Sequence, residues 1–234
     1  KGNVVPHMVD PPHPDTVASS HSYRNHFNIS DQAVVVCRHG SDNSFDIDYV
    51  KRAIVELLLK FDAEKLHFVF LDTDSFRREL IDIAAATASP VHALQAARKQ
   101  VHFIPSTTDH SRKENFFKTC DCMLHARKEG ETFGLSVAEF SIRNKPVITQ
   151  EPRNRYADFH VRALGEKGIY YRDQATVVSQ ISALVTNGIP KDIDYNGYRE
   201  YLPEKVMETF KALFLDPVIL LIGKTDLNKL PTMW

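Results

Sequence analysis

Two glutamates with seven residues between them, Glu131 and Glu139, are the side chains in this sequence best placed for chemistry. They flank a polar turn and the start of a helical pattern. With roughly 3.6 residues per helical turn, one carboxylate lies at the mouth of the predicted helix and the other about two turns along it. This separation suits two carboxylates that hold two parts of one elongated ligand. Alternatively, Glu131 is a solvated capping residue and Glu139 a chance charge on an amphipathic helix.

The turn between the two glutamates could bind an anion. Gly134 lets a ligand approach the backbone without a side chain in the way. The N–H groups of residues 133–135 fall in the first turn of the predicted helix, and at the carboxyl end of a parallel strand such groups point outward with the positive end of the helix dipole. The inward face of this helix is expected to carry Leu135, Val137, Ala138 and Phe140.

Short apolar runs that alternate with helical patterns surround this stretch. The predicted strands cover residues 33–37, 67–71, 101–105, 122–126, 146–149 and, at one edge, 168–171. The predicted helices cover residues 45–61, 76–99 with a break at residues 89–90, 113–119, 133–140, 173–185 and 195–214. This alternation predicts an α/β fold, a Rossmann-like parallel sheet flanked by helices with right-handed crossovers. The apolar run at residues 217–223 has no predicted partner.

Ligand-type residues follow three of the predicted strands. Arg38 and His39 follow the first strand, the polar loop at residues 106–113 follows the third, and residues 127–134 follow the fourth. Because the carboxyl ends of parallel strands meet at one edge of a sheet, these three loops are expected to converge there. On the plainer interpretation, Arg38 is an ordinary exposed charge.

Residues 131–139, Glu-Thr-Phe-Gly-Leu-Ser-Val-Ala-Glu, resemble the Glu-x7-Glu signature of retaining GT-B glycosyltransferases, usually written E-G-F-G-L-P-x-x-E. A Lys-Pro-Val-Ile strand follows in the expected place. The similarity, to glycosyltransferase family 4-like enzymes (glycosyl transferases group 1), covers roughly residues 1–214 and is strongest over residues 101–149. It implies the C-terminal domain of such an enzyme, which binds a nucleotide-diphospho-sugar donor.

The resemblance also implies roles for individual residues. The first glutamate of the signature, Glu131, would contact the donor sugar, and Arg38 is the best match for the arginine that binds the donor diphosphate; these two are the predicted catalytic residues. The second glutamate, Glu139, would hold the ribose hydroxyls. The predicted donor-binding residues are Glu139, Thr132, Phe133, Gly134, Leu135, His39, Arg127, His125, Thr107 and Lys113. An equally good interpretation is that His125 is a structural histidine of the strand, with its hydrogen bonds made inside the fold.

The chain departs from the family pattern at two positions. Asn43 stands where the family commonly has a second phosphate-binding lysine, and that role is not transferred to Lys51. Thr132 replaces the usual glycine, so the identity of the donor sugar cannot be inferred from the family. The family resemblance further implies retention at the anomeric carbon, catalysis without a metal or other cofactor, and a glycan or other hydroxyl compound as acceptor.

The predicted domain organisation lacks half of a GT-B enzyme. Residues 1–22 read as an extended, proline-rich linker, residues 23–190 as the donor-binding domain and residues 191–234 as a C-terminal helix and tail. The linker sequence Val-Val-Pro-His-Met-Val-Asp resembles the V-I-P-N-G-V-D linker that leads into the C-terminal domain of GT-B enzymes. The acceptor-binding N-terminal domain is expected elsewhere in the same protein or is replaced by a homodimer partner.

Two other functions remain open. Asp72 and Asp74 follow a predicted strand, as in the metal-binding Asp-x-Asp of GT-A glycosyltransferases, although the same residues suit a turn and a helix N-cap. A non-catalytic nucleotide-sugar or glycan-binding module is the third interpretation.

Composition excludes several classes of partner. Twenty-nine basic against thirty acidic residues leave a net charge of −1, so neither nucleic acid nor an anionic membrane is an expected partner. No apolar run spans a bilayer, and no signal-peptide pattern is present. Three cysteines do not form a disulfide framework, which indicates a reducing compartment and a cytoplasmic location. A zinc site from Cys120, Cys122 and His125 is disfavoured by strand alternation.

Overall fold

The computed structural model describes residues 5–12, 14–19, 21–153 and 157–217. Its centre is a six-stranded sheet in the order β3-β2-β1-β4-β5-β6, and every neighbouring pair of strands is parallel. The strands are β1 (Val34–His39), β2 (Leu66–Leu71), β3 (Val101–Ile104), β4 (Cys122–Leu124), β5 (Val147–Gln150) and β6 (Ile169–Tyr171). The predicted Rossmann-like parallel sheet is confirmed.

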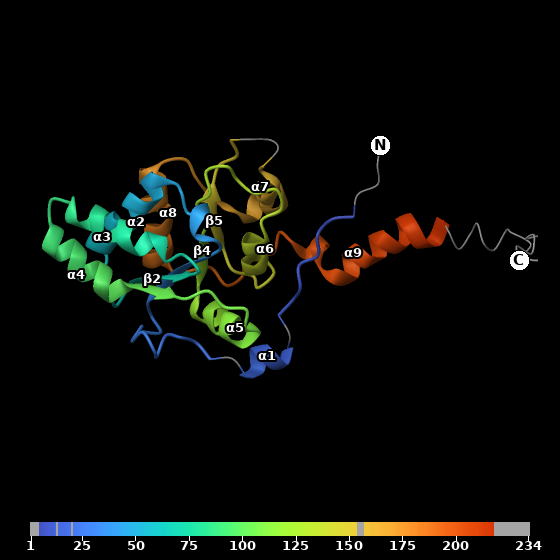
Figure 1. The fold of residues 1–234 in the computed structure, drawn as a ribbon, viewed down its shortest axis with the longest axis horizontal. Helices are drawn as coiled ribbons and strands as arrows, with labels where there is room; N and C mark the ends of the chain where they lie inside the picture. Colours follow the sequence, from blue (N-terminus) through green and yellow to red (C-terminus); the bar gives the residue numbers. More distant parts are fainter. Residues whose placement is uncertain (1–4, 13, 20, 154–156, 218–234) are drawn as a thin grey trace, which may run out of the picture.

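Helices cover both faces of the sheet (Figure 1). One face packs against α2 (Asp48–Lys60), α3 (Ser75–Ala85), α4 (Pro90–Gln100) and α8 (Gln174–Asn187). The other face packs against α5 (His110–Thr119), α6 (Leu135–Ser141) and α7 (Phe159–Leu164). The remaining helices are α1 (Pro14–Ser19) and α9 (Pro203–Phe210), which continues into a π-helical turn at Lys211–Leu215.

The alternation of side chains along each strand divides the core in two. In β1, Val34 and Val36 join the α2 side, whereas Val35 and Cys37 join the α5 side. Successive side chains of a strand point to opposite faces, and both faces of this sheet are covered. The strands are therefore continuous apolar runs, as expected of a buried parallel sheet.

The strand order reverses between β1 and β4, and this reversal creates the crevice in which ligands bind in open α/β sheets. From β1 the chain moves outward to β2 and β3, then crosses back to β4 on the other side of β1. The pairing of Val36 with Cys122 and of Cys37 with Met123 sets the register. It brings His39 and the loop after Leu124 to the same edge of the sheet.

The predicted helix at residues 195–214 begins later than expected. Pro203 occupies the first helical position and forces Leu202 into an extended conformation, so the preceding residues cannot continue the helix. Tyr195 and Tyr198 are instead buried, and the Tyr198 hydroxyl donates a hydrogen bond of 2.7 Å to the Phe133 carbonyl.

The structure differs from the sequence prediction at two other segments. The linker prediction is wrong for α1, which begins at Pro14, where a proline suits the first turn of a helix. The charged loop at residues 150–158 leads into α7, which the sequence analysis missed. The unassigned run at residues 217–223 lies outside the described residues, apart from Pro217.

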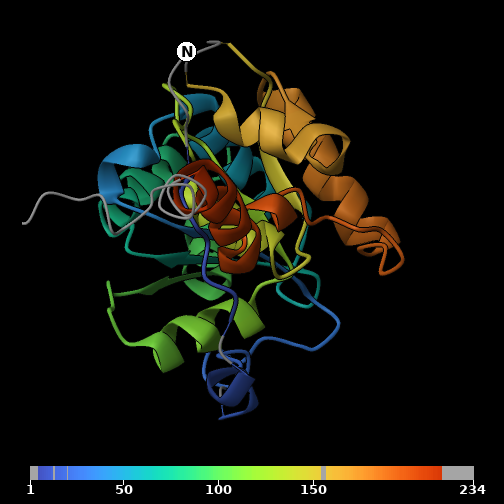
Figure 2. The same ribbon diagram turned by 90° about the vertical axis from the view of Figure 1, so that its right-hand side faces the viewer.

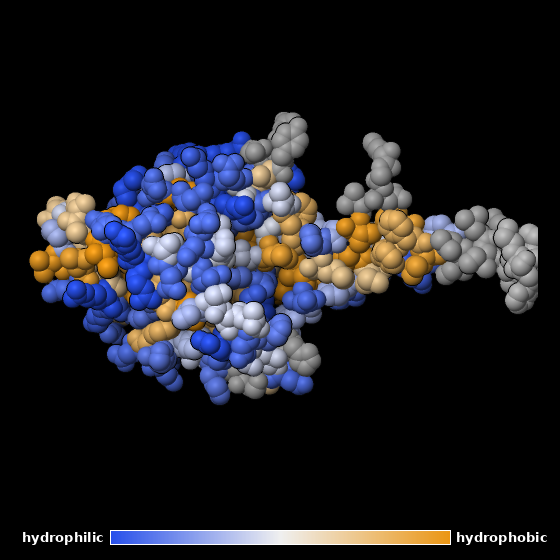
Figure 3. All heavy atoms as spheres, in the orientation of Figure 1, coloured by the Kyte–Doolittle hydropathy of each residue, from blue (hydrophilic) through white to orange (hydrophobic). Residues whose placement is uncertain are grey.

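The projecting C-terminal helix carries apolar side chains. Figure 1 shows α9 extending away from the sheet, and Figure 2 looks along it. Met207, Phe214 and Leu215 are each more than 40% exposed, and apolar atoms gather on this part of the molecule in Figure 3. No helix within the described ranges is long and apolar enough to cross a membrane.

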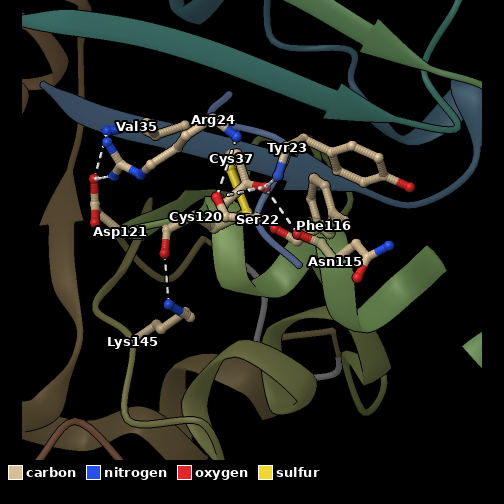
Figure 4. The surroundings of a disulfide bond; sticks show 11 residues. Ser22, Tyr23, Arg24, Val35, Cys37, Asn115, Phe116, Cys120, Asp121 and Lys145 are labelled. Atoms are coloured by element: carbon tan, nitrogen blue, oxygen red, sulfur yellow. Dashed lines mark hydrogen bonds and ion pairs between the residues drawn. A yellow bond between two sulfur atoms is a disulfide. The ribbon is translucent and has the colours of Figure 1, made fainter. Parts of the chain in front are cut away.

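Two of the three cysteines form a disulfide bond (Figure 4). Cys37 near the end of β1 is joined to Cys120, the residue after α5, with Cα atoms 5.6 Å apart, and Cys122 is free and buried. The prediction of unpaired cysteines is wrong because the pairing depends on α5 packing against β1, which cysteine counting cannot reveal. Cys120 is thereby excluded as a zinc ligand. The cysteines give no support to a reducing compartment, and the cytoplasmic location stays a prediction.

We expect the Cys37→Ala/Cys120→Ala variant to lose about 2–4 kcal/mol of unfolding free energy, because the bond closes a long loop in the unfolded chain. Urea denaturation of both proteins measures the difference. As a control, alkylation in denaturant without reductant should modify Cys122 alone, and all three cysteines after reduction. Three reactive thiols before reduction would contradict the bond.

Candidate functional site

A cleft of about 870 Å³ lies at the carboxyl edge of the sheet, where the strand order reverses. It is lined from β1 and the loop after it, from α5, from the loop after β4 and from the first turns of α6. The predicted site residues that line it are His39, Lys113, Arg127, Glu131, Thr132, Phe133, Gly134, Leu135 and Glu139. The two glutamates of the signature therefore share one cleft.

The loop that carries Glu131 is held by the segment before α7. The Glu131 N–H donates to the Ala157 carbonyl, and the Glu131 carbonyl accepts from the Phe159 N–H at 3.1 Å. Gly130 makes this approach possible, since its φ is +72° and a Cβ there would lie 2.2 Å from the Ala157 oxygen. The backbone around Glu131 is thus fixed from both sides before any ligand binds.

Glu131 is held by one donor on each oxygen. His125 Nε2 lies 3.2 Å from Oε1, and Arg127 Nη1 donates to Oε2 at 2.9 Å. Burial alone would raise the pKa of this carboxyl group, but the hydrogen bond from His125 and the charge of Arg127 outweigh it. The pKa of Glu131 is lowered from its ordinary value, so the group is a carboxylate at neutral pH.

Glu139 is held in the same way by two other residues. His39 Nε2 lies 2.7 Å from Oε2, and Lys113 Nζ bonds to Oε1. Burial disfavours the charge, yet the close contact with His39 and the charge of Lys113 lower the pKa of Glu139 to about 2. Burial in turn lowers the pKa of His39, whose ring packs against Phe140. The second glutamate is therefore also ionised.

The helix after the glycine turn is shorter than predicted, and one of its residues faces the other way. Val137, Ala138 and Phe140 are buried as expected. Leu135 is wrongly predicted to face inward, because it is 53% exposed and lines the cleft. Gly134, with a φ of +81°, begins the helix and lies against the His160 side chain.

Arg38 turns into its own loop and is not among the described residues that line the cleft. Its guanidinium donates to the Gly40 carbonyl at 2.7 Å, to the Ser41 carbonyl at 3.0 Å and to the Ser44 hydroxyl at 2.7 Å. It is only 3% exposed, and burial lowers its pKa to about 10, which leaves it charged at neutral pH. Arg38 thus orders a cleft-lining loop, and direct contact with a diphosphate stays a prediction.

Two further predicted residues support the cleft from outside it. Thr107 accepts a hydrogen bond from the Asp109 N–H, and the Asp109 carboxylate caps the start of α5. Lys113 lies one turn further along this helix. His125 is not a lining residue either, and it acts through its contact with Glu131.

Asp72 and Asp74 do not form a site with the cleft. Asp72 has a φ of +58° in the turn after β2, and Asp74 contacts Arg77 at 3.3 Å. The α3 cap comes from Asp42, whose carboxylate accepts from the Ser75 N–H at 3.0 Å. Neither aspartate lines the cleft within the described part of the chain.

Several residues of the cleft were not predicted from the sequence. Val5, Pro6 and His7 line it from the N-terminal segment, and the His7 ring lies 5.4 Å from that of Phe133. Ser41, Ser44, Ser136 and Phe159 complete the lining with Gly40. Ser136 directly follows the predicted Leu135, and Ser41 and Ser44 lie within five residues after the predicted His39, so closeness in the sequence was a usable signal. For residues 5–7 only the resemblance of the linker pointed to this region.

Fold and cleft together define a Rossmann-like domain with a cleft at the point where its strand order reverses. No protein-family model matches the chain, and no curated protein matches it by sequence. Solved structures do match, and they are GT-B glycosyltransferases. The resemblance to this class is confirmed at the level of the fold.

Three of these structures show the extent of the similarity. A glycosyltransferase from Rickettsia africae has a TM-score of 0.59 and 14% identity, with 94% of this chain and 56% of that chain covered. WaaG, a glycosyltransferase involved in lipopolysaccharide biosynthesis, has a TM-score of 0.56 and 14% identity, with 88% of this chain and 55% of that chain covered. HepE from Anabaena, solved with UDP-glucose, has a TM-score of 0.56 and 12% identity, with 88% of this chain and 54% of that chain covered. The chain spans about half the length of the structures it matches.

We expect Glu139 to stabilise the fold in a pH-dependent way. Its folded pKa of about 2 lies below the ordinary 4.5, so its contribution is complete above about pH 4.5 and is lost as the pH falls toward 2. The shift corresponds to about 3 kcal/mol. Urea denaturation of the wild type and Glu139→Gln at pH 7 and pH 3 should give a smaller pH dependence for the variant. Equal pH dependence would show that Glu139 has an ordinary pKa.

Gly130→Ala is expected to destabilise the protein more than Gly188→Ala. Both glycines have a positive φ, which strains an alanine by about 1–3 kcal/mol, but only Gly130 has the Ala157 carbonyl in the way. Nothing lies within 4 Å of a Cβ at Gly188, which makes that variant the matched control. Denaturation midpoints measure both. Equal losses would mean that the Glu131 loop is not packed as described.

Proposed function

We propose that this chain is the donor-binding half of a glycosyltransferase that transfers a sugar from a nucleotide-diphospho-sugar to a glycan or other hydroxyl acceptor. The observation that carries the proposal is the placement of two ionised glutamates, Glu131 and Glu139, in one cleft at the switch point of the sheet. A carboxylate can accept hydrogen bonds from two adjacent hydroxyl groups. Glu139 would hold the ribose of the donor, and Glu131 the sugar to be transferred.

Binding of the donor would exchange the partners of both glutamates. Lys113 and Arg127 each pair with one glutamate, and their side chains are 31% and 42% exposed, so both can move without opening the core. The donor hydroxyls would replace them on the carboxylates, and the two cations would turn to the diphosphate. His39 and His125 would keep the carboxylates in place during the exchange.

The leaving nucleoside diphosphate would be stabilised by charges already present in the cleft. Lys113 and Arg127 supply two cations, and the buried Arg38 holds a third directly beneath the Gly40 and Ser41 backbone. Such preorganised charges lower the barrier because they need no rearrangement as the bond breaks. This arrangement favours catalysis without a metal, and the resemblance favours retention of configuration.

The acceptor site belongs to the half of the enzyme that this chain does not span. The chain covers only 54–56% of each matched structure, so the acceptor would be held by a further domain in the same protein or by a second copy. Donor binding by this chain is therefore the property to test first. A non-catalytic module would bind a donor yet leave it unreacted when the full protein is assayed.

Calorimetric titration with UDP, GDP and dTDP sugars is expected to find one donor class that binds, with the same affinity in the presence of EDTA. Glu131→Gln and Glu139→Gln should each weaken that binding about ten- to hundredfold, because each removes hydrogen bonds to a charged group worth about 1.5–3 kcal/mol.

Glu79→Gln is the control for these variants. Glu79 pairs with Lys51 and lines a separate groove between α2 and α3, so its loss should not change donor affinity. The proposal fails if no nucleotide sugar binds, or if both glutamate variants bind the donor as tightly as the wild type does.

A further inference from the structure

A chain of buried hydrogen bonds runs from α7 to the carboxylate of Glu131. His160 Nε2 lies 3.2 Å from the Thr149 hydroxyl oxygen, which lies 2.9 Å from His125 Nδ1. His125 Nε2 in turn lies 3.2 Å from Glu131 Oε1. Thr149, His160 and His125 are 0%, 2% and 5% exposed, so solvent does not compete for these bonds.

For a neutral His125, counting the protons determines the direction of every bond in the chain. Glu131 is ionised and can only accept, so His125 Nε2 carries a proton. In a neutral His125, Nδ1 is then bare and must accept from Thr149. The single hydroxyl proton of Thr149 is used in that bond, so its oxygen accepts from His160 Nε2–H.

The far end of the chain agrees with this order. His160 Nδ1 would then carry no proton, and it makes no hydrogen bond of acceptable geometry within the described residues. Burial outweighs the contact of the ring with the Glu131 backbone and lowers the pKa of His160 to about 3, which keeps the ring neutral. The reverse order would require a doubly protonated His125 that donates from both nitrogens.

We propose that Thr149 and His160 are positioning residues for Glu131: through them, His125 is held as the neutral tautomer that directs Nε2–H at the carboxylate. The proposal rests on the assignment of Glu131 to the donor sugar. Hydrogen bonds on both ring nitrogens fix the rotation of His125. When Arg127 leaves Glu131 for the diphosphate, this bond is the one that keeps the carboxylate charged and correctly oriented.

The protonation pattern can be measured without any ligand. In the full chain labelled with ¹⁵N-histidine, NMR at neutral pH should show the proton on Nε2 and none on Nδ1 in both His125 and His160. Signals are assigned by their loss in His125→Gln and His160→Gln. A proton on Nδ1 of either ring overturns the proposal, whether or not the protein binds a nucleotide sugar.

The consequence for binding is tested with UDP-glucose and UDP as probes. Valine is similar in size to threonine but lacks the hydroxyl group. Thr149→Val should therefore weaken the binding of UDP-glucose about tenfold (about 1.4 kcal/mol). The affinity for UDP should change less than about twofold, because UDP lacks the sugar that Glu131 holds. Thr149→Ser restores the hydroxyl and should restore UDP-glucose binding.

Thr119→Val removes another fully buried hydroxyl, outside the cleft, and is the control for a general loss of stability. Unchanged UDP-glucose affinity in Thr149→Val, or an equal loss for UDP, overturns the positioning role. If the wild type binds neither probe and no other nucleotide sugar, the proposed function is refuted. The NMR pattern then tests the order of the protons by itself.

Discussion

The site depends on the parallel pairing of β1 with β4. This contact joins two strands that are far apart in the sequence, and it is the place where the order of the sheet reverses. Without it, His39 at the end of β1 and the loop that carries Glu131 would not face each other. Because the pairing is buried between two helical layers, its register is determined by the core and not by the ligand.

Each carboxylate in the cleft has a neutralising environment that arises from different elements of the fold. Glu139 receives His39 from β1 and Lys113 from α5, and Glu131 receives His125 and Arg127 from the end of β4. Burying a charge is unfavourable unless donors replace the lost water. Each glutamate combines a buried histidine with a partly exposed cation, so one partner can remain while the other moves. Under the proposed function, this combination would let the donor replace one contact of each glutamate while the other contact holds the carboxylate in place.

Much of the fold and the centre of the site could be predicted from the sequence, because both follow from local patterns. Apolar runs separated by helical periodicity identified the sheet, and the seven-residue spacing identified Glu131 and Glu139. What failed depended on contacts between distant segments. The hydrogen bonds of Arg38 come from its own loop and Thr73, the Cys37–Cys120 bond needs α5 on β1, and the Thr149–His160 contact needs α7 over β5. None of these leaves a pattern in the sequence around the residue concerned.

The disulfide bond also changes how the chain responds to mechanical force. Cys37 and Cys120 are 83 residues apart, and the segment between them contains β2, β3 and the helices α2 to α5. If the two ends of the protein are pulled, tension passes across the sulfur–sulfur bond and bypasses this segment. About 280 Å of extended chain, at roughly 3.4 Å per residue, would stay hidden until the bond is reduced, so oxidised and reduced molecules would differ in contour length.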